Sequence, residues 1–171
     1  MSTAIVYGSN TGVGQTVADD LKELLGDRVN DVINIAEVEV DKLLEYDNLI
    51  LGISTWDIGE LQYDWADKAP PIPEKDWSNK TVAFWGMGDA AGYPDTFVDA
   101  LGMVWAPLSQ KGAKLVGKVA IDDYEFESSR ALCDNGTMFV GLPLDNDNEE
   151  EKTEERLAAW ADQLKKEMFG E

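Results

Sequence analysis

The sequence predicts an α/β fold built on a doubly wound parallel sheet with helices on both faces. Short apolar runs lack the polar alternation of half-exposed strands, which is typical of strands covered on both faces. Amphipathic helical stripes separate these runs, so that strands and helices alternate along the chain. Such alternation favours a parallel sheet with right-handed crossover connections.

The apolar runs are rich in Ile, Val, Leu and aromatic residues, and they give the expected strands. We expect buried strands at residues 4–7, 32–35, 49–53 and 82–85. A further run at residues 115–120 is of mixed character, and residues 139–144 offer a continuation of it.

Stripes of apolar residues at helical spacing predict the main helices. They lie at residues 13–25, 97–108 and 157–168. Gly26 follows the first stripe and Gly170 the last, and glycine after a helical stripe is a stop signal. Weaker patterns predict short helices at residues 40–46 and 61–68.

The charged and metal-ligating residues of the chain exclude several classes of partner and site. Its 171 residues include 14 Lys and Arg against 34 Asp and Glu, a formal net charge of −20. This charge repels phosphate backbones and anionic lipids, so nucleic acid and membranes are unfavourable partners. The absence of His excludes His-based triads and His metal ligands, and one Cys cannot form an internal disulfide or a thiolate cluster.

The chain length, without a repeat or a linker, predicts one domain that spans residues 1–171, and we expect a monomer. We find no targeting signal and no apolar run long enough to span a membrane. The cytoplasm is therefore the expected compartment.

Ligands of open parallel sheets bind at the carboxyl ends of the strands, which points to the loops at residues 8–16, 54–65 and 86–99. The first loop is rich in Gly and hydroxyl residues and precedes a helix, an arrangement that suits a phosphate. It is not a Walker A loop, and Val17 breaks a dinucleotide fingerprint. Taken on its own, the segment is more simply interpreted as a turn whose side chains cap a helix.

Aromatic residues in the other two loops favour a ligand site over a simple helix-capping turn. Trp56 and Tyr93 follow neighbouring strands of the expected sheet, where they could enclose a flat ring. A lone aromatic residue there would more often pack on the rim of the core. Two of them beside a phosphate loop indicate a mononucleotide, and flavin mononucleotide (FMN) fits this description.

The chain resembles the flavodoxins over nearly its whole length. The matching segments are GSNTG at 8–12, TWDIGEL at 55–61, GDAAGYPD at 88–95 and FVGLPLD at 139–145. An insertion at residues 120–138 that splits the last strand resembles the long-chain branch of the family. The resemblance implies a five-stranded parallel sheet of order 2-1-3-4-5. It also implies one tightly but non-covalently bound FMN.

By position, the resemblance implies that the first loop binds the phosphate and that Trp56 and Tyr93 stack on opposite faces of the isoalloxazine ring. Their neighbours would line the ring edges, and Asp145 would lie near the ribityl chain. No catalytic or metal-binding residue is expected. The expected cofactor-binding residues are Ser9, Asn10, Thr11, Gly12, Val13, Gly14, Thr55, Trp56, Asp57, Ile58, Gly59, Met87, Gly88, Asp89, Tyr93, Asp99 and Asp145.

Two residues depart from the family pattern. Gly14 stands where the loop usually ends in a Thr whose hydroxyl contacts the phosphate, and Thr16 is a nearby hydroxyl. Met87 stands where Thr is common, which places a thioether near the flavin. Both departures predict fewer polar contacts to the cofactor.

The resemblance implies a low-potential one-electron carrier that is not an enzyme, with FMN shuttling between semiquinone and hydroquinone. Rotation of the peptide between Asp57 and Ile58 would stabilise the semiquinone, and Asp tolerates unusual backbone angles. Carboxylates in the two aromatic loops would penalise the reduced, anionic flavin. These carboxylates are Asp57, Glu60, Asp64, Asp67, Asp89, Asp95 and Asp99.

The acidic loops also predict partners with basic patches and salt-sensitive association. The resemblance implies ferredoxin–NADP reductase, photosystem I, nitrogenase or pyruvate oxidoreductase, without a choice among them.

Two other functions stay open from the sequence: an FMN-dependent quinone or azo reductase on the same fold, and an FMN-free interaction module. A reductase needs a substrate pocket over the flavin, which Trp56 and Tyr93 would close. A phosphoacceptor receiver domain is disfavoured, because residues 8–9 and 54–55 are not the acidic residues that it requires.

Overall fold

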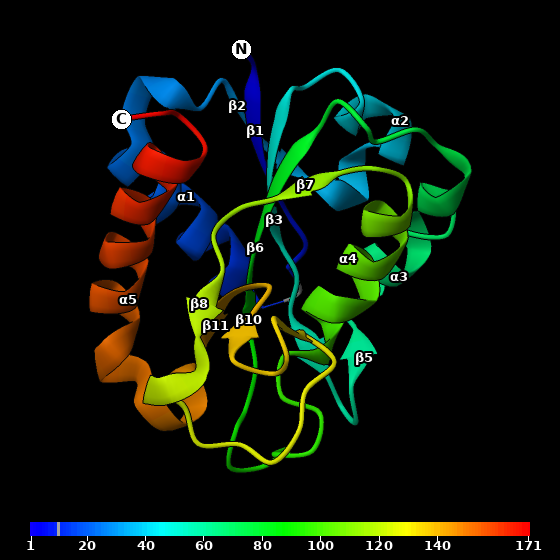
Figure 1. Cartoon of the computed structure of the whole chain (residues 1–171). Helices are drawn as coiled ribbons and strands as arrows, with labels where there is room; N and C mark the ends of the chain where they lie inside the picture. The colour runs from blue at the N-terminus through cyan, green and yellow to red at the C-terminus, as the bar shows by residue number, and fades with distance from the viewer. Residues whose placement is uncertain (10) are drawn as a thin grey trace.

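A parallel sheet lies between two layers of helices in the computed structural model, which describes residues 1–9 and 11–171 (Figure 1). The strand order is β2-β1-β3-β6-β11, which confirms the predicted order 2-1-3-4-5. These strands are β1 (Thr3–Tyr7), β2 (Asp31–Asn34), β3 (Asn48–Gly52), β6 (Thr81–Met87) and β11 (Gly141–Leu144).

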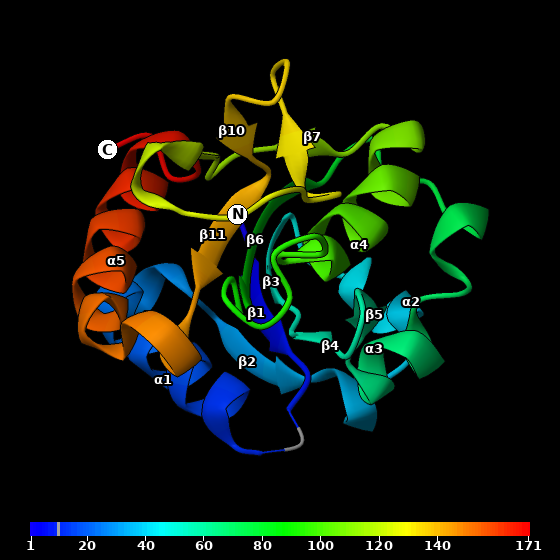
Figure 2. The same cartoon turned by 90° about the horizontal axis from the view of Figure 1, so that it is seen from below.

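Helices cover both faces of the sheet, as predicted. One face carries α1 (Val13–Leu25) and α5 (Asn146–Glu167), which pack against each other and against β1 and β11. The opposite face carries α2 (Val40–Leu43), α3 (Tyr63–Lys68) and α4 (Asp99–Gln110). Figure 2 shows the sheet edge-on between these two layers.

Alternate residues of each buried strand supply the two cores. In β1, Ile5 faces the cluster that contains Leu21 and Trp160, whereas Val6 faces the cluster that contains Leu101. All five side chains are at most 1% exposed. This double coverage explains why the central strands are continuous apolar runs in the sequence.

The last strand position of the sheet is divided between two segments. β7 (Lys114–Leu115) pairs with the start of β6, and β11 pairs with the remainder of β6. The expected single strand at 115–120 is therefore wrong: Leu115 ends β7, and residues 119–120 form a separate strand outside the main sheet. The chain turns away at Gly117, which has a φ of +83°, and the indole N–H of Trp160 donates to the Gly117 carbonyl at 2.9 Å.

Between β7 and β11 the insertion forms a small antiparallel sheet of order β8-β10-β9. Its strands are β8 (Val119–Ala120), β9 (Leu132–Cys133) and β10 (Met138–Phe139), and a 3-10 turn at Ile121–Asp123 follows β8. The expected strand at residues 139–144 is thus two strands: Phe139 pairs within the insertion, and β11 pairs within the main sheet.

The edges of the fold depart from the prediction in two further places. β2 was expected to be buried, but it lies at the sheet edge, pairs with β1 alone and is half-buried to exposed. Ile35 leaves this strand and begins a 3-10 turn at Ile35–Glu37. Other 3-10 turns lie at Gly26–Arg28 and Ile72–Glu74, and α2 is shorter than the predicted helix.

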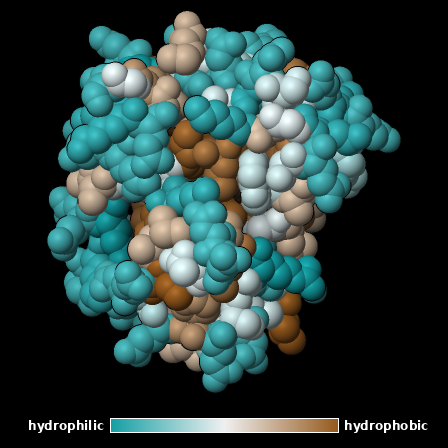
Figure 3. Space-filling view, viewed as in Figure 1, coloured by the Kyte–Doolittle hydropathy of each residue, from teal (hydrophilic) through white to brown (hydrophobic). Residues whose placement is uncertain are grey.

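The molecular face in Figure 3 is mainly hydrophilic, with apolar side chains visible towards its middle, between the helical flanks. This surface agrees with the net charge of −20. Within the described part of the chain, no helix is both long enough and apolar enough to cross a membrane.

Candidate functional site

A cavity of about 440 Å³ lies where the loops after β1, β3 and β6 meet, at the carboxyl ends of these parallel strands. The start of α5 completes its wall. The lining residues are Thr11, Val13, Ser54, Thr55, Trp56, Asp57, Met87, Gly88, Asp89, Tyr93, Thr96, Phe97, Val98, Asn146 and Asp147.

The first loop leads directly into α1. Gly12 is the N-cap residue, with a φ of +86°, and its N–H donates to the Ser9 hydroxyl at 2.9 Å. Thr11 and Val13 line the cavity on either side of it. The Thr16 hydroxyl donates to the Gly12 carbonyl at 3.1 Å, so it bonds to the helix backbone and does not replace the hydroxyl that Gly14 lacks.

Gly14 is required by close packing within this loop. A Cβ at position 14 would lie 2.9 Å from the Gly8 carbonyl oxygen and 3.2 Å from the Ser9 Cβ. Backbone contacts this short cannot be relieved by a rotamer change. The departure from the family pattern at Gly14 therefore has a steric cause in this chain.

The second loop forms a hairpin that presents Trp56. Its strands are β4 (Thr55–Trp56) and β5 (Glu60–Leu61), which the sequence did not predict. Asp57 has a φ of +47° and Gly59 a φ of +80°, so the turn is left-handed at both positions. Trp56 and Asp57 line the cavity, whereas Ile58, at 78% exposed, forms the exposed tip.

The third loop carries Tyr93, which lines the cavity and is 45% exposed. The Tyr93 N–H donates to the Asp89 carbonyl at 2.9 Å, and the Gly92 N–H donates to the Asp89 carboxylate at 2.7 Å. The Gly92 N–H, together with the Asn148 amide at 2.8 Å, lowers the pKa of Asp89 below its ordinary value. Asp89 is thus held as a carboxylate on the cavity wall.

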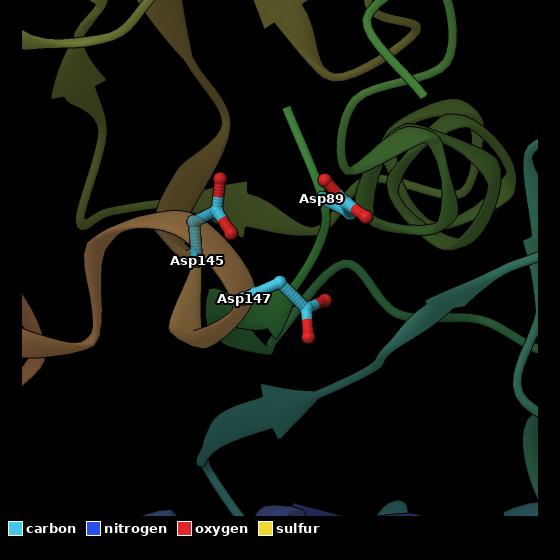
Figure 4. A group of neighbouring side chains, drawn as sticks. All are labelled: Asp89, Asp145 and Asp147. Carbon is cyan, nitrogen blue, oxygen red and sulfur yellow. The ribbon is translucent and has the colours of Figure 1, made fainter. Parts of the chain in front are cut away.

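Asp89, Asp145 and Asp147 lie together at the ends of β6 and β11 and the start of α5 (Figure 4). One oxygen from each lies within 4.8 Å of the others. The side-chain amide of Asn148 donates to both Asp89 and Asp145, and the Ala90 N–H donates to Asp145 at 3.1 Å. These bonds satisfy the buried Asp145, which caps α5 and anchors the third loop.

Asp99 does not face the cavity. It is 4% exposed, and its carboxylate accepts a hydrogen bond at 2.7 Å from the Arg130 N–H of the insertion. A Cβ on Gly59 would lie 2.9 Å from the other carboxylate oxygen. The expectation that Asp99 lines the ring edge is replaced by a position behind the hairpin.

The structure gathers many of the sequence-predicted residues around one cavity and leaves others outside its lining. Asn10 lies outside the described residues. Those in the lining are Thr11, Val13, Thr55, Trp56, Asp57, Met87, Gly88, Asp89 and Tyr93. Those outside the lining are Ser9, Gly12, Gly14, Ile58, Gly59, Asp99 and Asp145.

Sequence reasoning missed several lining residues: Ser54, Thr96, Phe97, Val98, Asn146 and Asp147. For Asn146 and Asp147, the acidic run that begins at Asp145 is a visible signal in the sequence. Thr96 carries a buried hydroxyl oxygen without a hydrogen-bond partner among the described residues. Such a group at a cavity wall fits a polar ligand.

The charged side chains that line the described part of the cavity are all negative. Its lining includes the carboxylates of Asp57, Asp89 and Asp147, and none of the described lining residues is Lys or Arg. Apolar and aromatic surface accompanies this charge, from Trp56 and Tyr93. The site can therefore hold a flat ring with polar groups, and it disfavours negative charge that develops on that ring.

Comparison with known proteins identifies relatives of the whole chain. The family model for flavodoxin matches residues 5–160. A flavodoxin from Nostoc sp. is 41% identical over 164 residues, covering 96% of this chain and 95% of the relative. Flavodoxin 1 from Azotobacter vinelandii is 43% identical over 169 residues, covering 96% of each chain.

A solved structure shares the same architecture. Fusobacterium nucleatum flavodoxin bound to flavin mononucleotide superposes with a TM-score of 0.89 at 27% sequence identity. The match covers 97% of this chain and 98% of that one.

Proposed function

Since the chain belongs to the flavodoxin family, we propose that it binds one FMN non-covalently in the cavity and carries electrons between redox enzymes. Flavodoxins are electron-transfer proteins rather than enzymes. The flavin would supply the redox chemistry by accepting one or two electrons, and the protein would bind it and tune it.

The lining residues divide between the two ends of the cofactor. Thr11 and the amino end of α1 suit the phosphate, because unpaired N–H groups and the helix dipole favour an anion there. Trp56 and Tyr93 suit the ring system, with offset or stacked aromatic contacts. Thr96 offers a hydroxyl that has no partner among the described residues, and Asn146 offers an amide.

The carboxylates on the cavity wall are the observation that supports a low-potential function. Asp57, Asp89 and Asp147 line the cavity, and the described lining contains no Lys or Arg to offset them. Each carboxylate opposes negative charge on the ring, by about 1 kcal/mol at short range in water and by more where the site is dry. We infer that the second electron enters at low potential.

We also infer that the hairpin restricts the protein to single-electron steps. Asp57 already adopts a left-handed conformation next to Ile58, where the peptide can present either its N–H or its carbonyl to the cavity. A carbonyl there can accept a hydrogen bond from a protonated ring nitrogen, which would favour the state after one electron.

The partners proposed are redox enzymes with basic patches. Ile58 is an exposed apolar residue at the hairpin tip, with the exposed carboxylates of Asp57 and Glu60 in the same turn. Such an acidic rim with an apolar centre fits brief, salt-sensitive docking. The family resemblance suggests ferredoxin–NADP reductase, photosystem I, nitrogenase or pyruvate oxidoreductase.

Titration of the flavin-free protein with FMN tests the binding proposal. We expect saturable binding at one FMN per chain, followed by changes in the visible flavin spectrum. Trp56→Ala should weaken binding at least about tenfold through loss of ring contact. Trp105→Phe, at a half-buried ring outside the lining, is the matched control and should leave binding within about twofold. Absence of FMN binding would contradict the proposal.

A further inference from the structure

Asp99, at the start of α4, is a buried carboxylate that the cavity does not use. Its side chain accepts the Arg130 N–H at 2.7 Å, and the Arg130 guanidinium lies 3.8 Å away and is largely exposed. A buried carboxylate is costly unless it is hydrogen-bonded or paired. The backbone N–H of Arg130 is the partner that stabilises the Asp99 carboxylate, because exposed ion pairs contribute little to stability.

The hairpin that presents Trp56 lies against the Asp99 carboxylate. A Cβ on Gly59 would lie 2.9 Å from Asp99 Oδ2 and 3.1 Å from the Thr96 Cβ, so a larger residue at position 59 would force these neighbours to shift. At the base of the hairpin, the Ala100 N–H donates to the Thr55 hydroxyl at 2.9 Å. The first turn of α4 therefore contacts the hairpin both at its base, at Thr55, and next to its tip, at Gly59.

Val98, immediately before Asp99, adopts a strained conformation. Its φ of +48° and ψ of +31° place it in the left-handed region, which is a genuine outlier for a β-branched residue. It is fully buried, lines the cavity and lies within reach of Gly88, where an added Cβ would be 2.9 Å from Val98 Cγ1. Such strain persists only where the surroundings hold the residue in place.

We propose that Asp99 is a positioning residue for the FMN site, which ties the Trp56 hairpin to the insertion and keeps Val98 against the cavity. The inference rests on the proposed function, since it concerns the same site. Asp99 Oδ1 faces the Arg130 N–H and Oδ2 faces Gly59, so the carboxylate acts through the hairpin and does not touch the flavin.

Two substitutions at this position separate positioning from charge. Asp99→Ala removes both oxygens, and we expect FMN to bind about tenfold more weakly. Asp99→Asn keeps an oxygen that accepts the Arg130 N–H, and we expect affinity and both midpoint potentials to stay close to wild type. If Asp99→Asn raises the potentials as much as Asp99→Ala does, the charge acts directly and the positioning role is wrong.

Arg130→Ala provides the matched control. It removes the exposed guanidinium but keeps the backbone N–H that bonds to Asp99. We expect FMN affinity to change by less than about twofold. A loss as large as that of Asp99→Ala would assign the effect to the ion pair and overturn the proposal.

A double-mutant cycle with Gly59→Ala tests the contact itself, and it does not depend on Asp99→Ala alone. Gly59→Ala should weaken FMN binding in the wild type, because its Cβ meets Asp99 Oδ2. In the Asp99→Ala background the positive φ of residue 59 and the contact with Thr96 remain, so the same change should still weaken binding, but by about twofold less. Equal costs in the two backgrounds would show that the hairpin does not rest on Asp99.

Hydrogen exchange in the flavin-free protein provides a readout that does not require FMN binding. Amides of residues 55–61 should exchange about tenfold faster in Asp99→Ala than in the wild type or Asp99→Asn. Unchanged exchange would refute the positioning role even where FMN binds. A wild type that binds no FMN, with faster exchange in Asp99→Ala, would refute the proposed function and leave the positioning role intact.

Discussion

The indole ring of Trp56 packs against the phenol ring of Tyr63, with ring centroids 4.8 Å apart and an interplanar angle of 60°. Tyr63 is the first residue of α3, and it is 61% exposed, although it touches a residue of the cavity wall. The phenol ring therefore restricts where the indole can lie. An exposed aromatic residue that the sequence did not single out becomes part of the support of the site.

Replacing Tyr63 should therefore affect cofactor binding without direct contact to the cofactor. Tyr63→Ala removes the ring that supports Trp56, and we expect FMN affinity to fall about three- to tenfold, since aromatic pairs are worth about 0.5–1.5 kcal/mol. Tyr63→Phe keeps the ring and should retain wild-type affinity. Fluorescence titration of the flavin-free variants with FMN measures both, and equal affinities for all three proteins would show that the contact does not support Trp56.

Restoring the hydroxyl that the family usually has at position 14 should harm this protein. In Gly14→Thr the new Cβ would lie 2.9 Å from the Gly8 carbonyl oxygen, so the loop must move. We expect a loss of about 1–3 kcal/mol in the free energy of unfolding, together with weaker FMN binding.

Gln15→Thr, on the exposed side of the same helix turn, is the matched control for the β-branched side chain and should cost less than about 1 kcal/mol. Urea unfolding of the flavin-free proteins gives the comparison. A Gly14→Thr variant that binds FMN more tightly than the wild type would contradict the steric account of this loop.

Asp89 should titrate below an ordinary aspartate, because the Gly92 N–H and the Asn148 amide bond to its charged form and lower its pKa. A group whose pKa is depressed by folding stabilises the folded state above its unfolded pKa of about 4. That contribution disappears as the pH falls through the folded value.

Asn148→Ala removes one of these donors and should raise the pKa of Asp89 towards its ordinary value. Carboxyl carbon NMR during an acid titration measures the change directly. Asp76, whose pKa is lowered by hydrogen bonds from Ser78 and not from Asn148, is the reference carboxylate and should titrate alike in both proteins. An unchanged titration of Asp89 in Asn148→Ala would contradict the proposed cause.

Arg156 should stabilise the insertion against α5. Its guanidinium lies 4.2 Å from the centre of the Tyr124 ring and donates to Asp123 and Glu149 at 3.1 and 3.2 Å. The side chain is 9% exposed, so Arg156→Ala removes buried packing as well as charge. We expect a loss of about 2 kcal/mol in the free energy of unfolding.

Lys152→Ala is the matched control, because Lys152 pairs with the same two carboxylates but is 38% exposed. We expect that change to cost less than about 1 kcal/mol. Urea denaturation of the flavin-free proteins gives both values, and equal losses would show that burial of the Arg156 stem contributes nothing.

The central fold could be predicted because both faces of its sheet are covered. Continuous apolar runs such as 49–53 are typical of such strands, and the helical stripes around Leu21 and Leu101 indicate the covering layers. The insertion could not be resolved in the same way. Its strands are two residues long, and its course depends on Gly117 and on the bond from Trp160 to that residue, which local periodicity does not reveal.

The residues of the site likewise differ in whether the sequence could predict them. Trp56, Tyr93 and the first loop stand out in the sequence because aromatic and Gly-rich residues are unusual at strand ends. Val98 and Thr96 line the cavity where the chain makes a left-handed turn at Val98, a conformation that a β-branched residue in the sequence does not indicate. Asp99 is displaced from the expected ring edge because the insertion supplies the Arg130 N–H, a contact across 31 residues of sequence.

The central claim is that the acidic cavity holds FMN and makes it a low-potential carrier of single electrons. Anaerobic reductive titration of the FMN-loaded protein, followed by its visible spectrum and referenced to dyes of known potential, tests this most directly. We predict two separate one-electron steps, with a long-wavelength absorbing species between them and a second midpoint potential well below that of free FMN. A single two-electron step near the potential of free FMN would contradict it.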